Sequence, residues 1–192
     1  MKTFWLAVLA LMPSATEAHR LDEYLQATLI SVERDTVKLE VNLTPGVAIL
    51  PAILERIDSD RDGVISEREE RDYTEVVAAD LTLSLDDHPL KLVLTDSRFD
   101  PWSEMREGRG VIRLRFEAEL PHGNQTTHKL HFENRHQPLI SAYLVNSLVP
   151  SDKFIHIQSQ QRDYFQTNFR LAYSQSAGNT TGRGAYVAGS LI

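Results

Sequence analysis

Apolar residues recur at every second position over much of the chain, a pattern that predicts β-strands with one buried face. In segment 36–44 the apolar members of the alternation are Val37, Leu39, Val41 and Leu43. Segment 112–120 shows the same period and is the clearest expected strand of the chain. A further strand is expected over 24–33, so that 24–33 and 36–44 form a hairpin.

The period changes after the Pro45-Gly46 dipeptide, which interrupts the strand pattern. An amphipathic helix is expected over 50–57, where the apolar residues at helical spacing are Leu50, Ile53, Leu54 and Ile57. A second helix is expected to begin after Ser66, because Ser66 and Glu69 have the form of a capping box. Its predicted apolar face comprises Tyr73, Val76 and Val77. Residues 47–79 are therefore expected to form a helix–loop–helix.

The rest of the chain returns to strand patterns separated by turn residues. A second hairpin is expected over 81–94, with its turn at 86–89, and four more strands over 127–133, 142–149, 154–160 and 164–173. About nine short strands favour an antiparallel sandwich over a parallel sheet, which needs alternating helices. We therefore expect a mainly β, immunoglobulin-like sandwich over 19–173, with an EF-hand helix–loop–helix inserted at 47–79.

The two ends of the chain have a different composition from the predicted sandwich. Residues 1–18 combine Lys2, an apolar run over 4–12 and the small residues Thr16 and Ala18 before an expected cleavage point. This order is typical of a signal peptide and predicts a periplasmic or secreted protein. No later segment is apolar for long enough to cross a membrane. Residues 174–192 are rich in Gly, Ser, Asn and Thr and are expected to form a flexible polar tail.

Composition narrows the class of protein further. With 192 residues, of which 42% are hydrophobic, the chain is long enough for one domain with a substantial core. It contains no cysteine, so disulfides and thiolate metal sites are excluded. A formal charge of −7, with no block of basic residues, makes nucleic acid an unfavourable partner.

Segment 58–69 fills every demanding position of an EF-hand calcium loop. Acids occupy loop positions 1, 3, 5 and 12, and Gly63 occupies position 6, where the chain must turn sharply. The expected calcium ligands are Asp58, Asp60, Asp62, Val64 through its carbonyl, Ser66 directly or through water, and Glu69 with both oxygens. The alternative is an acidic turn on a solvated helical hairpin with no bound ion. The sequence contains no second loop of this kind, so a structural or weakly sensing site is favoured over a cooperative switch.

Histidines and catalytic motifs give weaker signals. His128, His131 and His136 lie close in sequence, but His128 and His131 point to opposite faces of an expected strand. After the expected cleavage behind Ala18, His19 would be the N-terminal residue. It would then carry an α-amine and an imidazole, a pair that can chelate copper. The sequence has no HExxH motif, no GxSxG elbow and no Gly-rich phosphate loop, and we expect no enzymatic activity.

Several stretches together resemble a known bacterial group. They are 19–26 (HRLDEYLQ), 42–47 (NLTPGV), the loop 58–69, 133–136 (ENRH) and 143–146 (YLVN). The chain resembles the extracytoplasmic domain at the front of membrane proteins related to HupE/UreJ-type and nickel/cobalt transporters. That resemblance implies an envelope or membrane transporter as partner, and it implies no catalytic residue.

Two functions therefore remain open at the level of sequence. The first is an exported calcium-binding protein with a single EF-hand that acts as a structural or interaction module. The alternative is an accessory protein for nickel, cobalt or copper handling or transport, in which His19 or other histidines bind the metal.

Overall fold

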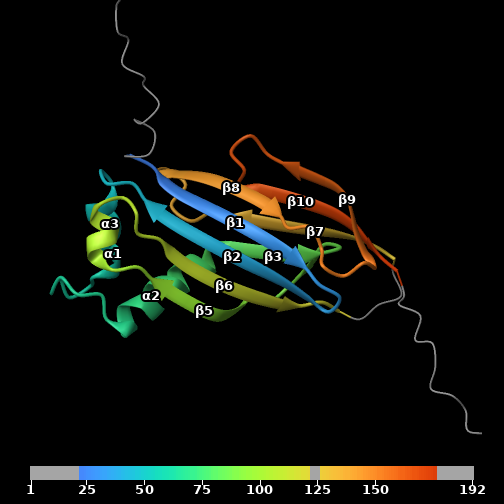
Figure 1. Cartoon of the computed structure of the whole chain (residues 1–192), viewed down its shortest axis with the longest axis horizontal. Coiled ribbons are helices and arrows are strands. Elements are labelled where there is room, and N and C mark those ends of the chain that lie inside the picture. The colour runs from blue at the N-terminus through green and yellow to red at the C-terminus, as the bar shows by residue number, and fades with distance from the viewer. Residues whose placement is uncertain (1–21, 122–125, 177–192) are drawn as a thin grey trace, which may run out of the picture.

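Two five-stranded β-sheets face each other and form the body of the computed structural model, which describes residues 22–121 and 126–176 (Figure 1). The first sheet has the order β5 (Val93–Phe99), β6 (Ile112–Glu119), β2 (Thr36–Pro45), β1 (Tyr24–Val32) and β8 (Ser141–Ser147). The second has the order β4 (His88–Pro89), β3 (Leu81–Leu85), β7 (Thr127–Asn134), β10 (Asn168–Gln175) and β9 (Ile155–Arg162). The prediction of a mainly β sandwich is confirmed.

Strand pairing is antiparallel throughout both sheets except at one place. β1 pairs with β8 in parallel, with Tyr24 opposite Ser141 and Ile30 opposite Ser147. The predicted antiparallel sandwich therefore contains one parallel pair. Parallel neighbours need a long connection, and the whole chain between β1 and β8 supplies it.

The core lies between the sheets and follows the sequence alternation. Val37, Leu39, Val41 and Leu43 of β2 are all buried, and each faces inward beside a buried residue of β6 such as Phe116. The second sheet contributes the apolar faces of β7 and β10. Because the apolar period matches the strand period, one face of each strand can leave water without burying its charged face.

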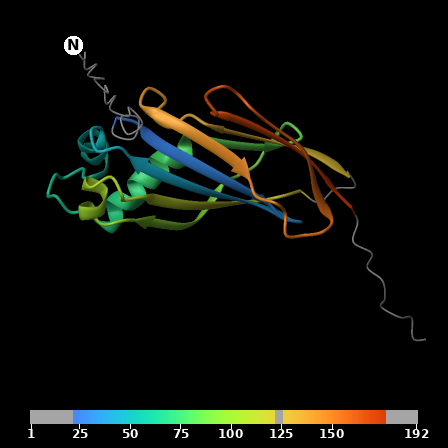
Figure 2. The ribbon, with the colours of Figure 1, turned by 45° about the horizontal axis from the view of Figure 1, so that its top comes forward.

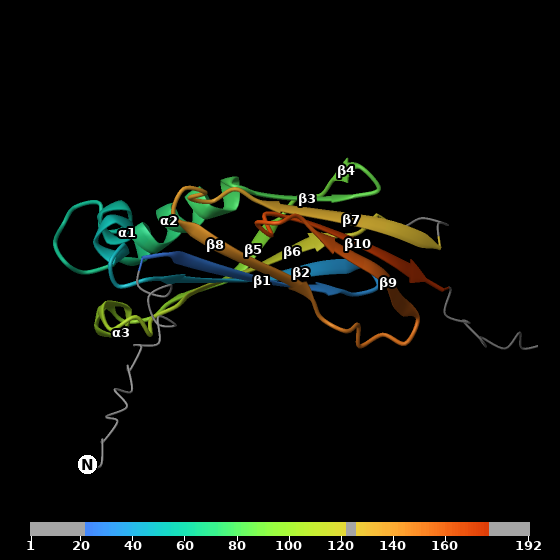
Figure 3. The same ribbon diagram turned by 90° about the horizontal axis from the view of Figure 1, so that it is seen from above.

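Three helices lie at one end of the sandwich (Figures 1, 2 and 3). The first two, α1 (Leu50–Ile57) and α2 (Glu67–Ala79), connect β2 to β3, and α3 (Trp102–Arg106) connects β5 to β6. All four predicted apolar residues of α1 are buried, and so are Tyr73 and Val77 of α2. None of the helices within the described ranges combines the length and the apolar composition that a membrane-spanning helix needs.

The predicted hairpin over 81–94 is wrong in its second half. β3 pairs with β4 only through Ser84–Pro89 and Leu85–His88, and the chain then crosses to the other sheet. There β5 pairs with β6, starting with Val93 opposite Glu117. Alternation indicates which side chains can be buried, but it does not identify the neighbouring strand.

Other boundaries differ in smaller ways from the sequence prediction. Helix α3 was not expected, and the strand predicted over 164–173 begins at Asn168. Val76 is 53% exposed and does not belong to the buried face of α2. β10 extends to Gln175, beyond the predicted start of the tail, and 177–192 lie outside the described residues, as does the predicted signal peptide over 1–18.

Side chains of the β9–β10 hairpin cover the outer edge of β8. The Nε of Arg162 donates to the carbonyl oxygen of Val145 at 2.6 Å, and Gln166 Oε1 accepts from the Val145 backbone N–H at 3.3 Å. An open strand edge would expose such groups to pairing by another chain. The hairpin therefore satisfies part of this edge within the molecule.

A buried chain of hydrogen bonds joins α2 to the sandwich. Tyr24 of β1 contacts Tyr73 of α2 with their hydroxyl oxygens 2.8 Å apart, and the Tyr73 hydroxyl lies 3.2 Å from His136 Nε2. The other imidazole nitrogen, Nδ1, lies 2.8 Å from an Asp80 carboxylate oxygen. A neutral His136 that donates through Nδ1 to Asp80 accepts the Tyr73 hydroxyl hydrogen at Nε2.

The backbone around His136 is also fully engaged. Its carbonyl oxygen accepts hydrogen bonds from Gln26 Nε2 at 2.8 Å and from the Tyr143 hydroxyl at 2.7 Å. Its N–H donates to Asn134 Oδ1 at 2.9 Å, and Asn134 Nδ2 donates to Gln26 Oε1. This buried polar cluster satisfies its own members and holds the β7–β8 connection against β1.

We expect the buried imidazole to make folding stability fall as pH drops from about 7 to about 5. Burial lowers the pKa of His136, with Arg56 adding a smaller effect in the same direction and Asp80 opposing it. The unfolded chain therefore binds a proton at His136 that the folded protein does not bind. One such proton changes the free energy of unfolding by at most about 1.4 kcal/mol per pH unit. Chemical denaturation of the wild type and His136→Gln at several pH values measures this slope.

The exposed His156 of β9 provides the control, since His156→Gln should keep the slope of the wild type. A His136→Gln variant with an unchanged slope between pH 7 and 5 would show that another group is responsible.

Candidate metal site

The loop between α1 and α2 is anchored at both ends by apolar residues. Ile57, the last residue of α1, is buried, and Ile65 near the other end of the loop packs against the core. Between them the backbone of Arg61 and Gly63 has positive φ values of 61° and 81°. Gly63 adopts this left-handed conformation without steric cost, as the sharp turn of the loop requires.

Three carboxylates converge inside this loop. One oxygen each of Asp58, Asp60 and Glu69 can be chosen so that all lie within 4.8 Å of one another. Asp58 is 7% exposed and Glu69 is 4% exposed, whereas Asp60 is open to water. Two buried acids and one exposed acid therefore face a common point from both ends of the loop.

Glu69 is held in place by hydrogen bonds from both sides. Its Oε2 accepts from the Ser66 N–H at 2.9 Å and the Ser66 hydroxyl at 2.8 Å, and its Oε1 accepts from the Ser59 N–H at 2.7 Å. The Ser66 side chain in turn accepts from the Glu69 N–H, so the predicted capping box of α2 is confirmed. The backbone and hydroxyl hydrogen bonds from Ser66 lower the pKa of Glu69 to about 2. The carboxylate is therefore ionised at neutral pH.

The first half of the loop is organised by its own aspartates. The Asp58 carboxylate accepts from the N–H groups of Asp62 at 3.1 Å and Gly63 at 3.0 Å. Asp60 also accepts from the Asp62 N–H, at 3.2 Å, and Asp62 accepts from the Val64 N–H at 2.7 Å. These short-range bonds give the loop its shape through the same side chains that were predicted as ligands.

The six predicted ligands thus divide into two groups. Asp58, Asp60 and Glu69 form the close cluster. Of the other three, Asp62 contributes no oxygen to this close group, whereas Val64 and Ser66 were predicted through a carbonyl and a hydroxyl oxygen, and the Ser66 hydroxyl lies 2.8 Å from Glu69 Oε2. Sequence spacing identified the loop, but it could not show which side chains lie closest together.

The donor set fits a hard divalent cation. Carboxylate, hydroxyl and backbone oxygens are the ligands that calcium and magnesium prefer, and the cluster contains no nitrogen or sulfur. Three carboxylates this close repel one another, and a cation relieves that repulsion.

No histidine belongs to a group of three potential metal ligands within 22–121 and 126–176. The three histidines singled out from sequence each contact another side chain: His128 with Asp86, His131 with Asn168, and His136 with Asp80. His19 lies outside the described residues.

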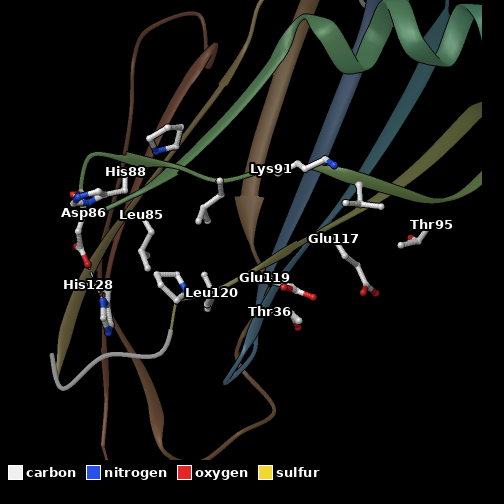
Figure 4. A pocket seen from close by; sticks show the side chains of 14 residues that line it. Thr36, Leu85, Asp86, His88, Lys91, Thr95, Glu117, Glu119, Leu120 and His128 are labelled. Atoms are coloured by element: carbon white, nitrogen blue, oxygen red, sulfur yellow. Dashed lines mark hydrogen bonds and ion pairs between the residues drawn. The ribbon is translucent and has the colours of Figure 1, made fainter.

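A second feature, which the sequence did not indicate, is a hollow of about 1220 Å³ where the chain crosses from β4 to β5 (Figure 4). β5 pairs with β6 only as far as Glu117, whereas β2 pairs with β6 as far as Glu119. Beyond Glu117, β6 therefore has β2 along one edge and this hollow near its other edge. Figure 4 shows Asp86 and His128 at one end of it, Glu119 near the middle and Thr95 at the other end. In the hairpin predicted over 81–94 both strands would lie in one sheet, so the chain would not cross between the sheets at this place.

A scan against protein-family models finds none that matches this chain, and a search of curated proteins gives no match. The class of site is therefore defined by geometry and donor chemistry alone.

We expect Ser66→Ala to lower the free energy of unfolding by about 1 kcal/mol in the presence of a chelator. The substitution removes the helix-capping oxygen of α2 and one of the donors to Glu69. Urea denaturation measures the loss, and Ser103→Ala at an exposed position of α3 is the matched control. Equal stability of Ser66→Ala and the parent protein would contradict the role of this cap.

Proposed function

We propose that 58–69 is a calcium-binding loop of EF-hand type, inserted into an immunoglobulin-like sandwich, and that the protein is an exported calcium-binding module. The observation that carries this proposal is the convergence of Asp58, Asp60 and Glu69 in a loop that links two helices. The two five-stranded, mostly antiparallel sheets support the immunoglobulin-like assignment.

The chain provides enough oxygen donors for calcium without any other protein. The residues that would hold the ion are Asp58, Asp60, Asp62, Val64 through its carbonyl, Ser66 and Glu69. Calcium would supply a positive charge that offsets the four acids. Magnesium fits less well, because it keeps several of its waters.

The position of the loop favours a structural or interaction role. Asp58 directly follows α1, and Glu69 lies in the first turn of α2, so ligands from both would tie the two helices together. Tyr73, one turn beyond Glu69, belongs to the buried hydrogen-bond chain through His136. A calcium ion that orders the loop would therefore also stabilise the junction between α2 and the sandwich.

Export and the identity of the partner rest on sequence patterns. The signal-peptide pattern over 1–18 supports a periplasmic or secreted location, and it lies outside the described residues. The resemblance to HupE/UreJ-type extracytoplasmic domains supports an envelope or membrane transporter protein as the partner. We propose a binding role for the module and no catalytic one.

We expect Glu69→Gln to weaken calcium binding at least about tenfold, which corresponds to about 1.4 kcal/mol. The change removes one negative charge from the cluster and keeps the size of the side chain. Isothermal titration of calcium into chelator-treated protein measures the affinity. Thermal unfolding with and without calcium checks that the ion binds the folded state, since calcium at 100 times its Kd should add about 2.7 kcal/mol.

Glu67→Gln is the matched control, because it makes the same chemical change two residues away on the same helix. The Glu67 carboxylate is exposed and forms a 3.8 Å ion pair with Arg71. Equal calcium affinity of the Glu69→Gln and Glu67→Gln variants would rule out this loop as the calcium site. Absence of calcium binding by the parent protein would contradict the proposed function as a whole.

A further inference from the structure

A second, smaller hollow lies between α1 and α3, directly beside the acidic loop. It has a volume of about 540 Å³, within the usual range for small-molecule sites. Apolar side chains from α1 and the segment before it form much of its wall, namely Val47, Leu50, Pro51 and Leu54. Trp102 of α3 and Asp58 of the loop also line it. We call it the α1–α3 hollow.

Trp102 brings an unsatisfied hydrogen-bond donor to this place. The indole Nε1 is buried and has no hydrogen-bond partner within the described part of the chain. A buried donor without an acceptor destabilises a protein. Trp102 lines the hollow, so a small movement of its indole would let a ligand oxygen satisfy this donor.

The charges at the rim differ in their pairing. Arg61 is bound to Glu55, with a nitrogen–oxygen distance of 3.2 Å. Arg106 forms no ion pair within the described ranges; its guanidinium lies over the Trp102 ring, 5.8 Å from the centroid. The rim therefore presents one cation that lacks a counter-charge.

We propose that the α1–α3 hollow binds a small amphipathic carboxylate. The apolar body of the ligand packs along Leu50, Leu54 and the indole of Trp102, and its carboxylate lies at Arg106. A carboxylate supplies the acceptor oxygens that a guanidinium and an indole N–H require. This combination of an apolar wall with a few polar groups is typical of ligand pockets.

The ligand site is coupled to the acidic loop through Asp58, which faces both. This coupling rests on the proposed calcium function, whereas the ligand site itself does not. Without calcium, the negative charge of Asp58 opposes an anionic ligand nearby. Neutralisation of the loop by calcium removes that opposition, so calcium strengthens ligand binding and, reciprocally, the ligand strengthens calcium binding.

Tryptophan fluorescence of the full chain tests the ligand site. The protein has two tryptophans, Trp5 and Trp102, so a Trp5→Phe background leaves Trp102 as the only emitter. Octanoate, titrated in the presence of calcium, should change this emission in a saturable way. Octylamine, which has the same apolar body and the opposite charge, should bind at least about tenfold more weakly.

Arg106→Gln in the same background should weaken octanoate binding at least about tenfold. Arg170→Gln, at an exposed arginine of β10 far along the chain, should leave it unchanged. Equal binding of octanoate and octylamine, a non-saturable response, or an unaffected Arg106→Gln variant would each overturn the ligand site.

Repeating the octanoate titration in chelator and in Glu69→Gln separates the two proposals. If octanoate binds more tightly with calcium than with chelator, and Glu69→Gln abolishes this difference, the coupling is supported. If the affinity for octanoate is the same under both conditions, the coupling is overturned and the ligand site stands. No octanoate response from a protein that still binds calcium overturns the ligand site and leaves the calcium function intact.

Discussion

Hydrogen bonding of the buried imidazole of His136 determines how α2 sits on the sandwich. A polar group removed from water must find partners, and the imidazole finds them in Tyr73 of α2 and Asp80 at the end of that helix, both far away in sequence. The Tyr73 hydroxyl is in turn hydrogen-bonded to Tyr24 of β1. Shifting α2 by one turn would leave several buried groups without partners, so its position is narrowly defined.

That constraint fixes the acidic loop in turn. Glu69 lies one turn before Tyr73 on α2, and Asp58 follows the buried Ile57 of α1. Both ends of the loop are therefore set by packed helices, and hydrogen bonds to Asp58 and Glu69 shape the segment between them. The carboxylates are held close despite their repulsion because many backbone N–H groups also point at them.

Local patterns made much of this structure predictable. The alternation in β2 and β6, the buried face of α1 and the Ser66–Glu69 capping box all involve residues within one element, and each is confirmed. Contacts between distant segments were not predictable, because Tyr73 and His136 are 63 positions apart and nothing local links them. For the same reason the partner of β5, the parallel pairing of β8 and the α1–α3 hollow could not be inferred. Loop spacing predicted the candidate site, whereas the close approach of Asp58, Asp60 and Glu69 depends on how the loop folds, which spacing alone does not give.

The parallel pair of β1 and β8 has a consequence for the order in which the chain folds. β1 and β2 can form a hairpin as soon as both have emerged, since their registers are set by adjacent residues. The other side of β1 must wait for Ser141–Ser147, more than a hundred residues later. Closing so long a loop is slow, because its entropy is lost before the new contacts form. One edge of the nascent hairpin therefore stays open during synthesis, and protection of that edge by a chaperone would matter most in that interval.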